Sequence, residues 1–211
     1  MWGRRHFGVL YTGDGTDPHG NNTPYAYGDA DNGTKQERKT RTGHAVMMNK
    51  CAISAKSKKR SVNASTLLSE MEASFWAARD LLGFVNVLNE LGLVQKGNHV
   101  YTDNEGNKCV IEGRMSLGST NKFADVRYLM MKEWHRVKRI TVLTKRTWEM
   151  IADIFTKALG RLQFERLRDC LTGYADIDTL ERSVRSDVNV LRRRLLRKKL
   201  KLLLKMHGKT E

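Results

Sequence analysis

Two periodicities of hydrophobic positions divide the middle of the chain into strands and helices. Short apolar or alternating runs predict strands at 25–30, 44–48, 51–55, 99–102 and 139–143. Apolar residues that recur every three or four positions predict helices at 65–92, 122–137, 147–159 and 162–171. The dipeptide Asn49-Lys50 between the second and third strands indicates a hairpin.

The order of these elements predicts the fold class. Three strands come first, and helices then alternate with two further strands, an order typical of a mixed sheet covered by helices in an α/β layer fold. Residues 1–24 are rich in Gly, Asn, Asp and Thr and contain both prolines, so we predict a linker there. The pattern changes again after Tyr174. We therefore predict one domain at 25–173 and a separate tail at 174–211.

The tail is basic and rich in leucine. Residues 191–205 contain eight Lys or Arg, seven Leu and no acidic residue, in a loosely helical pattern with too many charges to span a bilayer. Three roles stay open: a nuclear-import or nucleic-acid-binding patch, a membrane-surface helix, and read-through sequence without a selected role. We favour the first.

Composition and charge favour a folded protein with a polyanionic partner. Hydrophobic residues make up 40% of the chain, enough for a core and too many for wholesale disorder. The 38 Lys and Arg exceed the 23 Asp and Glu and give a net charge of +15, which costs self-repulsion in the compact state. Nucleic acid is therefore the leading candidate partner, and an anionic membrane surface is the second.

The cysteines and the N-terminal segment bear on the compartment. Cys51, Cys109 and Cys170 are odd in number and far apart, without a CxxC pair, so they predict buried thiols in a reducing compartment instead of zinc ligands or disulfides. Residues 1–11 contain no apolar run long enough for a signal peptide. We therefore expect an intracellular protein, cytoplasmic or nuclear, without a membrane partner.

Four acidic residues stand where this element order lets them converge. Asp29 lies within the first strand and Asp103 at the end of the fourth, where such sheets open onto a ligand crevice. Glu72 and Asp153 lie on predicted helices, beside apolar positions. Converging carboxylates cannot all ionise without a cation, and hard oxygen ligands select Mg²⁺ or Mn²⁺. On geometry alone, solvated surface carboxylates remain the simpler interpretation.

Short motifs surround these acids in order along the chain. They are YGDAD at 27–31, KTRTG at 39–43, SKKR at 57–60, SEMEA at 69–73, YTDN at 101–104, DVRY at 125–128 and ADIFTKAL at 152–159. The series resembles the ribonuclease H domain of Ty1/copia-type retrotransposon Gag-Pol polyproteins, and its last motif matches that family without change. The resemblance covers roughly residues 5–172.

The resemblance implies a fold, a reaction and a set of site residues. The fold would be a ribonuclease H-like mixed five-stranded sheet flanked by helices, with the basic helical tail added. The reaction would be metal-dependent endonucleolytic hydrolysis of the RNA strand of RNA–DNA hybrids, with two Mg²⁺ or Mn²⁺ ions. Asp29, Glu72, Asp103 and Asp153 would be the catalytic and metal-binding acids. The reverse transcriptase portion of the same polyprotein is a candidate partner, because the chain itself lacks a YxDD polymerase motif.

Two nearby acids compete for places in this set. Asp31 lies two residues after Asp29 and so faces the same side of the strand, as a lesser contributor. Glu70 and Glu72 differ by about 200° around a helix, so only one can face the site. The motif selects Glu72.

Basic residues near the second and third strands are candidates for substrate contacts. The group that matches a family motif is predicted to bind nucleic acid and comprises Lys56, Lys58, Lys59 and Arg60. A second group is as well explained by a solvated charge run and comprises Lys35, Arg38, Lys39 and Arg41.

The sequence also departs from the family pattern. Asn32 stands where a tryptophan is usual, and Ala55 or Lys56 replaces another. An alternative function is therefore a catalytically degenerate retroelement fragment that only binds nucleic acid through its basic surface. The intact set of acids favours the enzyme, whereas the lost aromatic residues and the missing polymerase portion favour the fragment.

Overall fold

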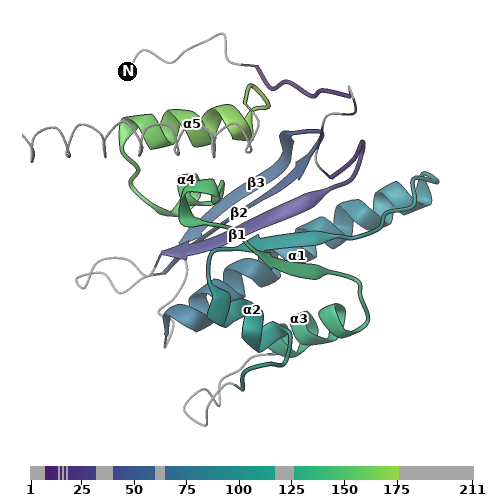
Figure 1. Cartoon of the computed structure of the whole chain (residues 1–211), viewed down its shortest axis with the longest axis vertical. Coiled ribbons are helices and arrows are strands. Elements are labelled where there is room, and N and C mark those ends of the chain that lie inside the picture. The colour runs from purple at the N-terminus through teal and green to yellow at the C-terminus, as the bar shows by residue number, and fades with distance from the viewer. Residues whose placement is uncertain are drawn as a thin grey trace, which may run out of the picture. The chain divides into compact units, whose positions relative to one another are not determined.

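A mixed five-stranded sheet forms the centre of the protein. The computed structural model describes residues 8–13, 15, 17, 19–31, 40–59, 65–116 and 126–175, and Figure 1 labels its elements. The strands are β1 (Tyr25–Asp31), β2 (Arg41–Met48), β3 (Cys51–Lys59), β4 (His99–Thr102) and β5 (Thr141–Thr144). Their order is β3-β2-β1-β4-β5, with antiparallel pairing on the β2–β3 side and parallel pairing of β1, β4 and β5. The predicted mixed sheet is confirmed.

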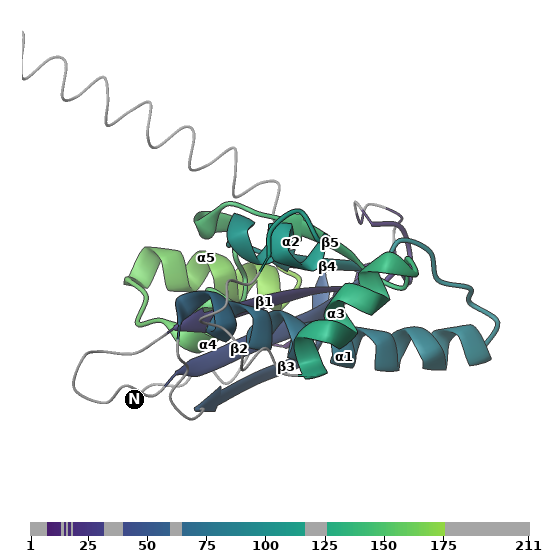
Figure 2. The ribbon, with the colours of Figure 1, turned by 90° about the horizontal axis from the view of Figure 1, so that it is seen from below.

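Helices cover both faces of this sheet (Figures 1 and 2). They are α1 (Thr66–Glu90), α2 (Glu105–Ile111), α3 (Val126–Arg136), the 3₁₀ turn η2 (Thr147–Glu149), α4 (Asp153–Thr156) and α5 (Arg161–Leu171). Helix α1 packs against β1, β2 and β4, and α2 and α3 pack beside it. Helices α4 and α5 cover the opposite face, over β1, β2 and β3.

The apolar core lies between α1 and the sheet. Side chains alternate along each strand, so every second residue of β1, β2 and β4 faces α1, whereas β5 packs against α2. The core is built from Ala26, Val46, Phe75, Ala77, Ala78, Leu81, Leu82, Val85, Val100, Ile111, Met131, Ile140 and Val142. This packing fixes α1 relative to β1 and β4, the three elements that carry the site described below.

The hairpin between β2 and β3 is confirmed. Asn49 and Lys50 have φ angles of 51° and 63°, which are the left-handed values of a two-residue type I′ turn. The buried carboxylate of Asp17 accepts a hydrogen bond from the backbone N–H of Lys50 at 2.8 Å, so this part of the predicted linker packs on the hairpin.

The predicted helix at 147–159 is wrong. The chain instead forms η2, passes through Met150 in an extended conformation (φ −80°, ψ 92°), and restarts as α4. The carboxylate of Glu149 accepts a hydrogen bond from the backbone N–H of Arg146, which closes the first turn on itself. Met150, Ile151 and Ala152 are all buried, and the extended backbone at Met150 separates η2 from α4.

The sequence pattern also missed α2. It has only seven residues, and its start is fixed by Asn104, whose side chain caps the helix at Asn107 N. Apolar periodicity is too short there to signal a helix.

The predicted tail lies outside the described residues from 176 onwards, as do Lys35, Arg38, Lys39 and Arg60. The described residues belong to one compact unit that ends at Ala175. No helix within the described ranges is long and apolar enough to cross a membrane. Cys51, Cys109 and Cys170 are free thiols, and Cys109 is the one that is only half-buried.

Candidate metal centre

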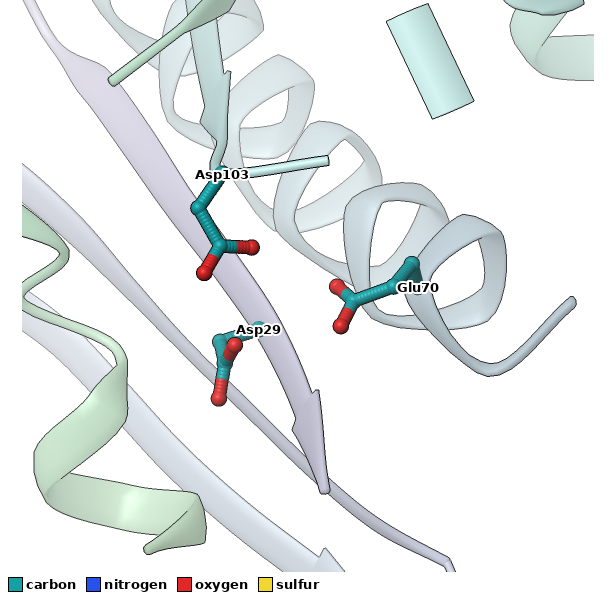
Figure 3. Close-up of side chains that lie close together, drawn as sticks. All are labelled: Asp29, Glu70 and Asp103. Atoms are coloured by element: carbon teal, nitrogen blue, oxygen red, sulfur yellow. The ribbon is translucent and has the colours of Figure 1, made fainter. Parts of the chain in front are cut away.

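Three carboxylates from three elements meet at one edge of the sheet. Asp29 lies in β1, Asp103 directly follows β4, and Glu70 lies in α1; each offers an oxygen within 4.8 Å of the others (Figure 3). The parallel register explains the first two, because Tyr27 pairs with Tyr101 and the residues two positions further point to the same side. We call Asp29, Glu70 and Asp103 the acid centre.

Gly28 brings α1 close enough to add the third carboxylate. A Cβ atom at this position would lie 2.9 Å from the backbone oxygen of Ala73, closer than such atoms approach in proteins. Glycine therefore allows helix and strand to touch, and Glu70 projects from the preceding turn of the helix towards Asp29. This explains the glycine within the YGDAD motif.

Glu70 is the least compensated member of the acid centre. Its side chain is buried, and Oε2 has no hydrogen-bond partner within the described residues. Burial and the charges of Asp29 and Asp103 raise the pKa of Glu70 to about 9. Burial, together with Asp29, also raises the pKa of Asp103. Only an added cation would let all three carboxylates ionise together, so the residues present fit a divalent metal ion.

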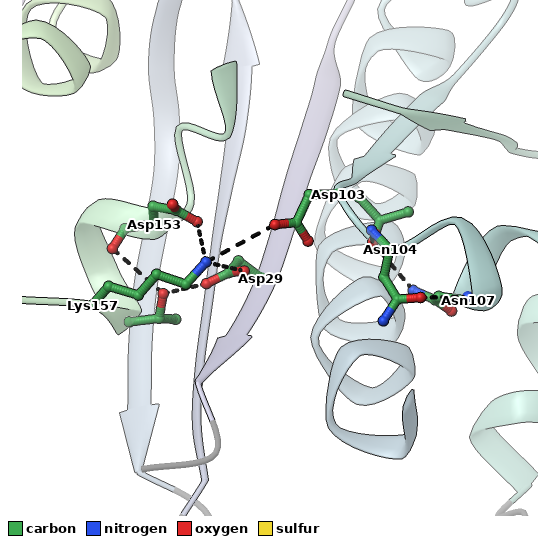
Figure 4. A network of polar contacts seen from close by, with 8 residues as sticks. Asp29, Asp103, Asn104, Asn107, Asp153 and Lys157 are labelled. Atoms are coloured by element: carbon green, nitrogen blue, oxygen red, sulfur yellow. Dashed lines mark hydrogen bonds and ion pairs between the residues drawn. The ribbon is translucent and has the colours of Figure 1, made fainter. Parts of the chain in front are cut away.

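Helix α4 brings a fourth acid and a lysine to the same place (Figure 4). Lys157 Nζ lies 2.8 Å from Asp153 Oδ1, 3.1 Å from Asp29 Oδ1 and 4.0 Å from Asp103 Oδ2. The hydroxyl of Thr156 donates a hydrogen bond to Asp29 Oδ2. Burial raises the pKa of Asp153 despite its hydrogen bond to Lys157. Asp29 is thus held by two residues of the ADIFTKAL motif.

Gly43 allows α4 to approach the sheet. It pairs with Asp29 across β1 and β2, and a Cβ atom there would lie 2.6 Å from Phe155 Cβ and 2.8 Å from Thr156 Cγ2. The hydroxyl of Ser57 also donates to the backbone oxygen of Phe155 at 2.7 Å. The glycine of KTRTG and the serine of SKKR therefore seat the helix that carries Asp153 and Lys157.

A buried amide network holds Asp103 in place (Figure 4). Thr102 Oγ1 accepts a hydrogen bond from Asn104 N at 3.2 Å, and Asn104 Oδ1 accepts one from Asn107 N at 3.0 Å. Asn107 Nδ2 then donates to Ser74 Oγ on α1 at 2.8 Å. The network joins β4, α2 and α1, so Asp103 is fixed between two helices and a strand.

The structure groups Glu70, and not the predicted Glu72, with Asp29 and Asp103. Glu72 Oε1 accepts hydrogen bonds from Arg127 Nη1 at 2.6 Å and from Trp76 Nε1 at 3.4 Å, away from the acid centre. The reason is helix packing. Glu70 shares its face with the small buried residues Ala73, Ser74 and Ala77, which lie against the sheet. That run of small residues three, four and seven positions after Glu70 is the signal that favours it.

The structure also places the other predicted acids, together with Lys157, relative to the acid centre. Asp29 and Asp103 belong to the acid centre, and Asp153 is linked to them through Lys157. Asp31 is the last residue of β1 and half-buried. Lys157 was not singled out from the sequence, because nothing in the pattern shows which lysine of a basic chain meets buried acids.

Of the predicted nucleic-acid contacts, Lys56 and Lys58 lie on the opposite face of the sheet from α4. Lys56 and Lys58 are exposed residues of β3, and Lys56 Nζ lies 2.6 Å from Asp80 Oδ2. Lys59 is exposed at the end of the same strand. A pocket, which we call the β2–β3 pocket, is lined by Thr42, His44, Lys56, Lys58, Trp76, Arg79 and Asp80.

Comparison of sequences relates the chain to a retroelement protein. No protein-family model matches it. Over 145 residues, 68% of its length, it is 33% identical to the retrovirus-related Pol polyprotein from transposon TNT 1-94 of Nicotiana tabacum. The matched part is 11% of that polyprotein, so the chain spans only a small part of this curated relative.

Comparison of structures relates the fold to ribonucleases H. The crystal structure of LC11-RNase H1 in complex with RNA/DNA hybrid is similar with a TM-score of 0.51 and 14% identity, covering 63% of this chain and 93% of that one. The solution structure of the PFV RNase H domain has a TM-score of 0.45 and 14% identity, with 72% and 93% covered. At such identities the likeness to LC11-RNase H1 establishes the fold alone.

Proposed function

The chain is a ribonuclease H-like domain of the retrotransposon Pol polyprotein family, and from this premise we propose that it hydrolyses the RNA strand of RNA–DNA hybrids. The proposal includes endonucleolytic cleavage, dependence on Mg²⁺ or Mn²⁺, and origin in a copia-type element. The motif series supports that origin, since it runs in the family's order from YGDAD to ADIFTKAL. The reverse transcriptase portion of the same polyprotein is the proposed partner.

The acid centre is the observation that carries this proposal. Asp29, Glu70 and Asp103 come from three elements and offer oxygens within 4.8 Å of one another, and one buried oxygen of Glu70 is without a partner. Hard, clustered carboxylate oxygens are the ligand set of Mg²⁺ and Mn²⁺. We propose these three residues as metal ligands, and Asp153 as a fourth acid beside them.

The protein's own residues then have defined tasks. Bound divalent ions supply activation of water and stabilisation of the leaving 3′ oxygen. Asp29, Glu70 and Asp103 hold the ions, and Thr156 orients Asp29 by a hydrogen bond. The Asn107 network keeps Asp103 and α1 from moving apart. The fold thus supplies fixed placement, which is the main requirement of metal-assisted phosphodiester hydrolysis.

The basic residues of β3 are proposed to bind the phosphates of the substrate. Lys58 and Lys59 are exposed, and Lys58 shares the β2–β3 pocket with Arg79 and Thr42. Each phosphate contact of this kind adds affinity that falls with salt. Contacts to the backbone position a duplex without reading its sequence, which suits an enzyme that cleaves hybrids generally.

Cleavage of a labelled RNA–DNA hybrid in Mg²⁺ and in Mn²⁺ tests the proposal. We expect metal-dependent cutting within the RNA strand, and a loss on the order of 10²-fold or more in Asp103→Asn, because even residues behind metal ligands contribute 10- to 100-fold. The matched control is Glu165→Gln, which removes an exposed carboxylate paired with Arg161 and should cleave as wild type does.

A folded protein that binds the hybrid but never cuts it would contradict the proposal. If wild type and Asp103→Asn then bound the hybrid equally, the alternative function would stand: a degenerate fragment that binds nucleic acid only through its basic surface. Circular dichroism on each variant shows whether it is folded.

A further inference from the structure

Lys157 places an ammonium group among acids that the proposed function assigns to metal binding. Its Nζ is 2.8 Å from Asp153 and 3.1 Å from Asp29, and both carboxylates have side chains only 1% exposed. The lysine side chain itself is 32% exposed, so its stem reaches the acids from the solvent side. The ammonium group therefore partly compensates the negative charge of these two buried carboxylates.

We propose that Lys157 is a built-in counter-ion of the metal-free site, which a divalent ion must displace from Asp29 and Asp153. The inference rests on the metal centre of the proposed function, but not on its cleavage activity. Lys157 would then stabilise the protein before metal binds and weaken metal affinity at the same time. It is a positioning residue, because it acts through the carboxylates.

The contacts of Lys157 divide the acids into two sides. On one side the ammonium bridges Asp29 and Asp153. On the other side Glu70 keeps an unpartnered buried oxygen, and Lys157 makes no hydrogen bond to it within the described residues. A first divalent ion therefore enters at Asp29, Glu70 and Asp103, where its charge is most needed. A second ion at Asp29 and Asp153 competes directly with the lysine.

Displacement is physically reasonable because lysine is flexible and singly charged. Four acids, Asp29, Glu70, Asp103 and Asp153, face one ammonium, so an ion of charge two neutralises the group better than the lysine does. The lysine side chain has a flexible four-carbon stem and lies partly in water, so its ammonium group can move away from the acids without disturbing the core. The hydroxyl of Thr156 would stay on Asp29 during this change.

Metal titration of the full chain tests the inference without any substrate. We compare wild type, Lys157→Gln and Lys157→Arg by calorimetry with Mn²⁺ or Mg²⁺ and by thermal unfolding in EDTA and in metal. Lys157→Gln should bind the weaker of two ions on the order of tenfold more tightly, the effect of one charge about 4 Å away in a solvated site. It should also unfold at a lower temperature in EDTA and gain more from metal than wild type. Lys157→Arg, which keeps the charge, should resemble wild type in EDTA.

The matched control is Lys56→Gln. It removes a lysine that also pairs with an aspartate, at 2.6 Å from Asp80, but on the opposite face of the sheet. Its metal isotherm should equal that of wild type. Equal isotherms and equal metal-induced shifts in wild type and Lys157→Gln would overturn the inference while leaving the metal centre intact. A wild type that bound no divalent ion would overturn both the inference and the proposed function.

A second measurement needs no variant and covers the case in which Lys157→Gln does not fold. Wild type is acetylated briefly with acetic anhydride, with and without Mn²⁺, and the modified lysines are identified by mass spectrometry. Displacement predicts that metal raises the acetylation of Lys157 severalfold relative to Lys56. Unchanged or reduced acetylation of Lys157 in metal would contradict the inference.

Discussion

The two faces of the sheet each pair a lysine with aspartate, but the balance of charge is opposite. On the α4 face, Lys157 meets Asp29 and Asp153, and the carboxylates of Asp103 and of Glu70 from α1 approach Asp29 at the sheet edge. On the α1 face, the β2–β3 pocket has one carboxylate, Asp80, which contacts Lys56 and His44 at 2.6 and 3.0 Å. Lys58 and Arg79 line the same pocket. One face has an excess of acid and the other an excess of base.

The pKa shifts follow this balance. Burial and neighbouring acids raise the pKa of Glu70 to about 9. Burial also raises the pKa of Asp80, but the hydrogen bonds from Lys56 and His44 outweigh it and lower the value overall. A buried carboxylate is thus paired with the protein's own cations on one face, whereas on the other it lacks such a partner and would need an added cation. This contrast suits metal ions on the α4 face and phosphates on the α1 face.

The largest effect is expected from Glu70→Gln, and the single variant Glu72→Gln in the same helix is its control. Glu70→Gln removes the buried carboxylate of the acid centre, so hybrid cleavage should fall by about 10²-fold or more. Glu72→Gln weakens the contacts with Arg127 and Trp76, and its cleavage should stay within about threefold of wild type, as expected for a partly exposed pair. Initial rates on one labelled hybrid give both numbers. A larger loss of cleavage in Glu72→Gln than in Glu70→Gln would instead support Glu72 as the site residue.

The two glutamates also show how far the sequence predicts the site. Asp29 and Asp103 lie at strand positions that the alternating pattern defines locally, but only the resemblance to the ribonuclease H motifs singled them out among the acids of the chain. The motif selects Glu72, but it does not determine which of the two glutamates faces the sheet. That depends on Gly28 and the small residues of α1, which let the helix touch β1. The contacts of Lys157 depend on tertiary packing in the same way.

The fold was predictable where local periodicity decides the structure. The strand at 99–102 has the bounds of β4, and Asn49-Lys50 forms the predicted turn. The prediction failed where packing overrides periodicity: Met150 is extended and buried, which splits the expected helix into η2 and α4. That split directs α4 across Gly43, and so brings Asp153 and Lys157 to Asp29.

The second prediction concerns a variant that disrupts the close approach of α1 to β1. In Gly28→Ala, the new Cβ would lie 2.9 Å from a backbone oxygen that cannot easily move, so the free energy of unfolding should fall by about 1–3 kcal/mol. Gly83→Ala is the matched control, because Gly83 lies in α1 and nothing lies within 4 Å of the position that its Cβ atom would take. Its free energy of unfolding should rise by about 0.5–1 kcal/mol. Urea denaturation measures both, and a Gly28→Ala protein as stable as wild type would contradict the packing argument.

The third prediction concerns the stability of the metal-free protein at different pH. Glu70 has a pKa of about 9 in the folded chain against 4.5 as its ordinary value, so between these values the folded state keeps a proton that the unfolded chain releases. The contribution of Glu70 to stability therefore falls as pH rises through this window, by at most about 1.4 kcal/mol per pH unit. In EDTA, the unfolding free energy of Glu70→Gln should depend less steeply on pH than that of wild type.

Asp80 supplies the opposite sign for comparison. Its pKa is lowered in the folded chain, so its contribution is present above its ordinary value of 3.8 and is lost as pH falls through the folded value. Asp80→Asn should therefore change the slope of stability against pH at the acid end, and Glu70→Gln should change that slope between about pH 4.5 and pH 9. Identical profiles for the two variants would contradict the assignment of opposite charge balance to the two faces.

The smallest effect is expected on the basic face. Lys58→Gln removes one charge from the β2–β3 pocket, so hybrid affinity should fall a few-fold at low salt, and the slope of log affinity against log salt should decrease by about 1. Lys96→Gln, an exposed lysine in the loop after α1, is the control and should leave the slope unchanged. Fluorescence anisotropy over a salt series, in Asp103→Asn protein to prevent cleavage, measures both. An unchanged salt slope in Lys58→Gln would contradict the proposal that the β2–β3 pocket binds the substrate. The assignment of the acid centre would still stand, because the two sites share no residue.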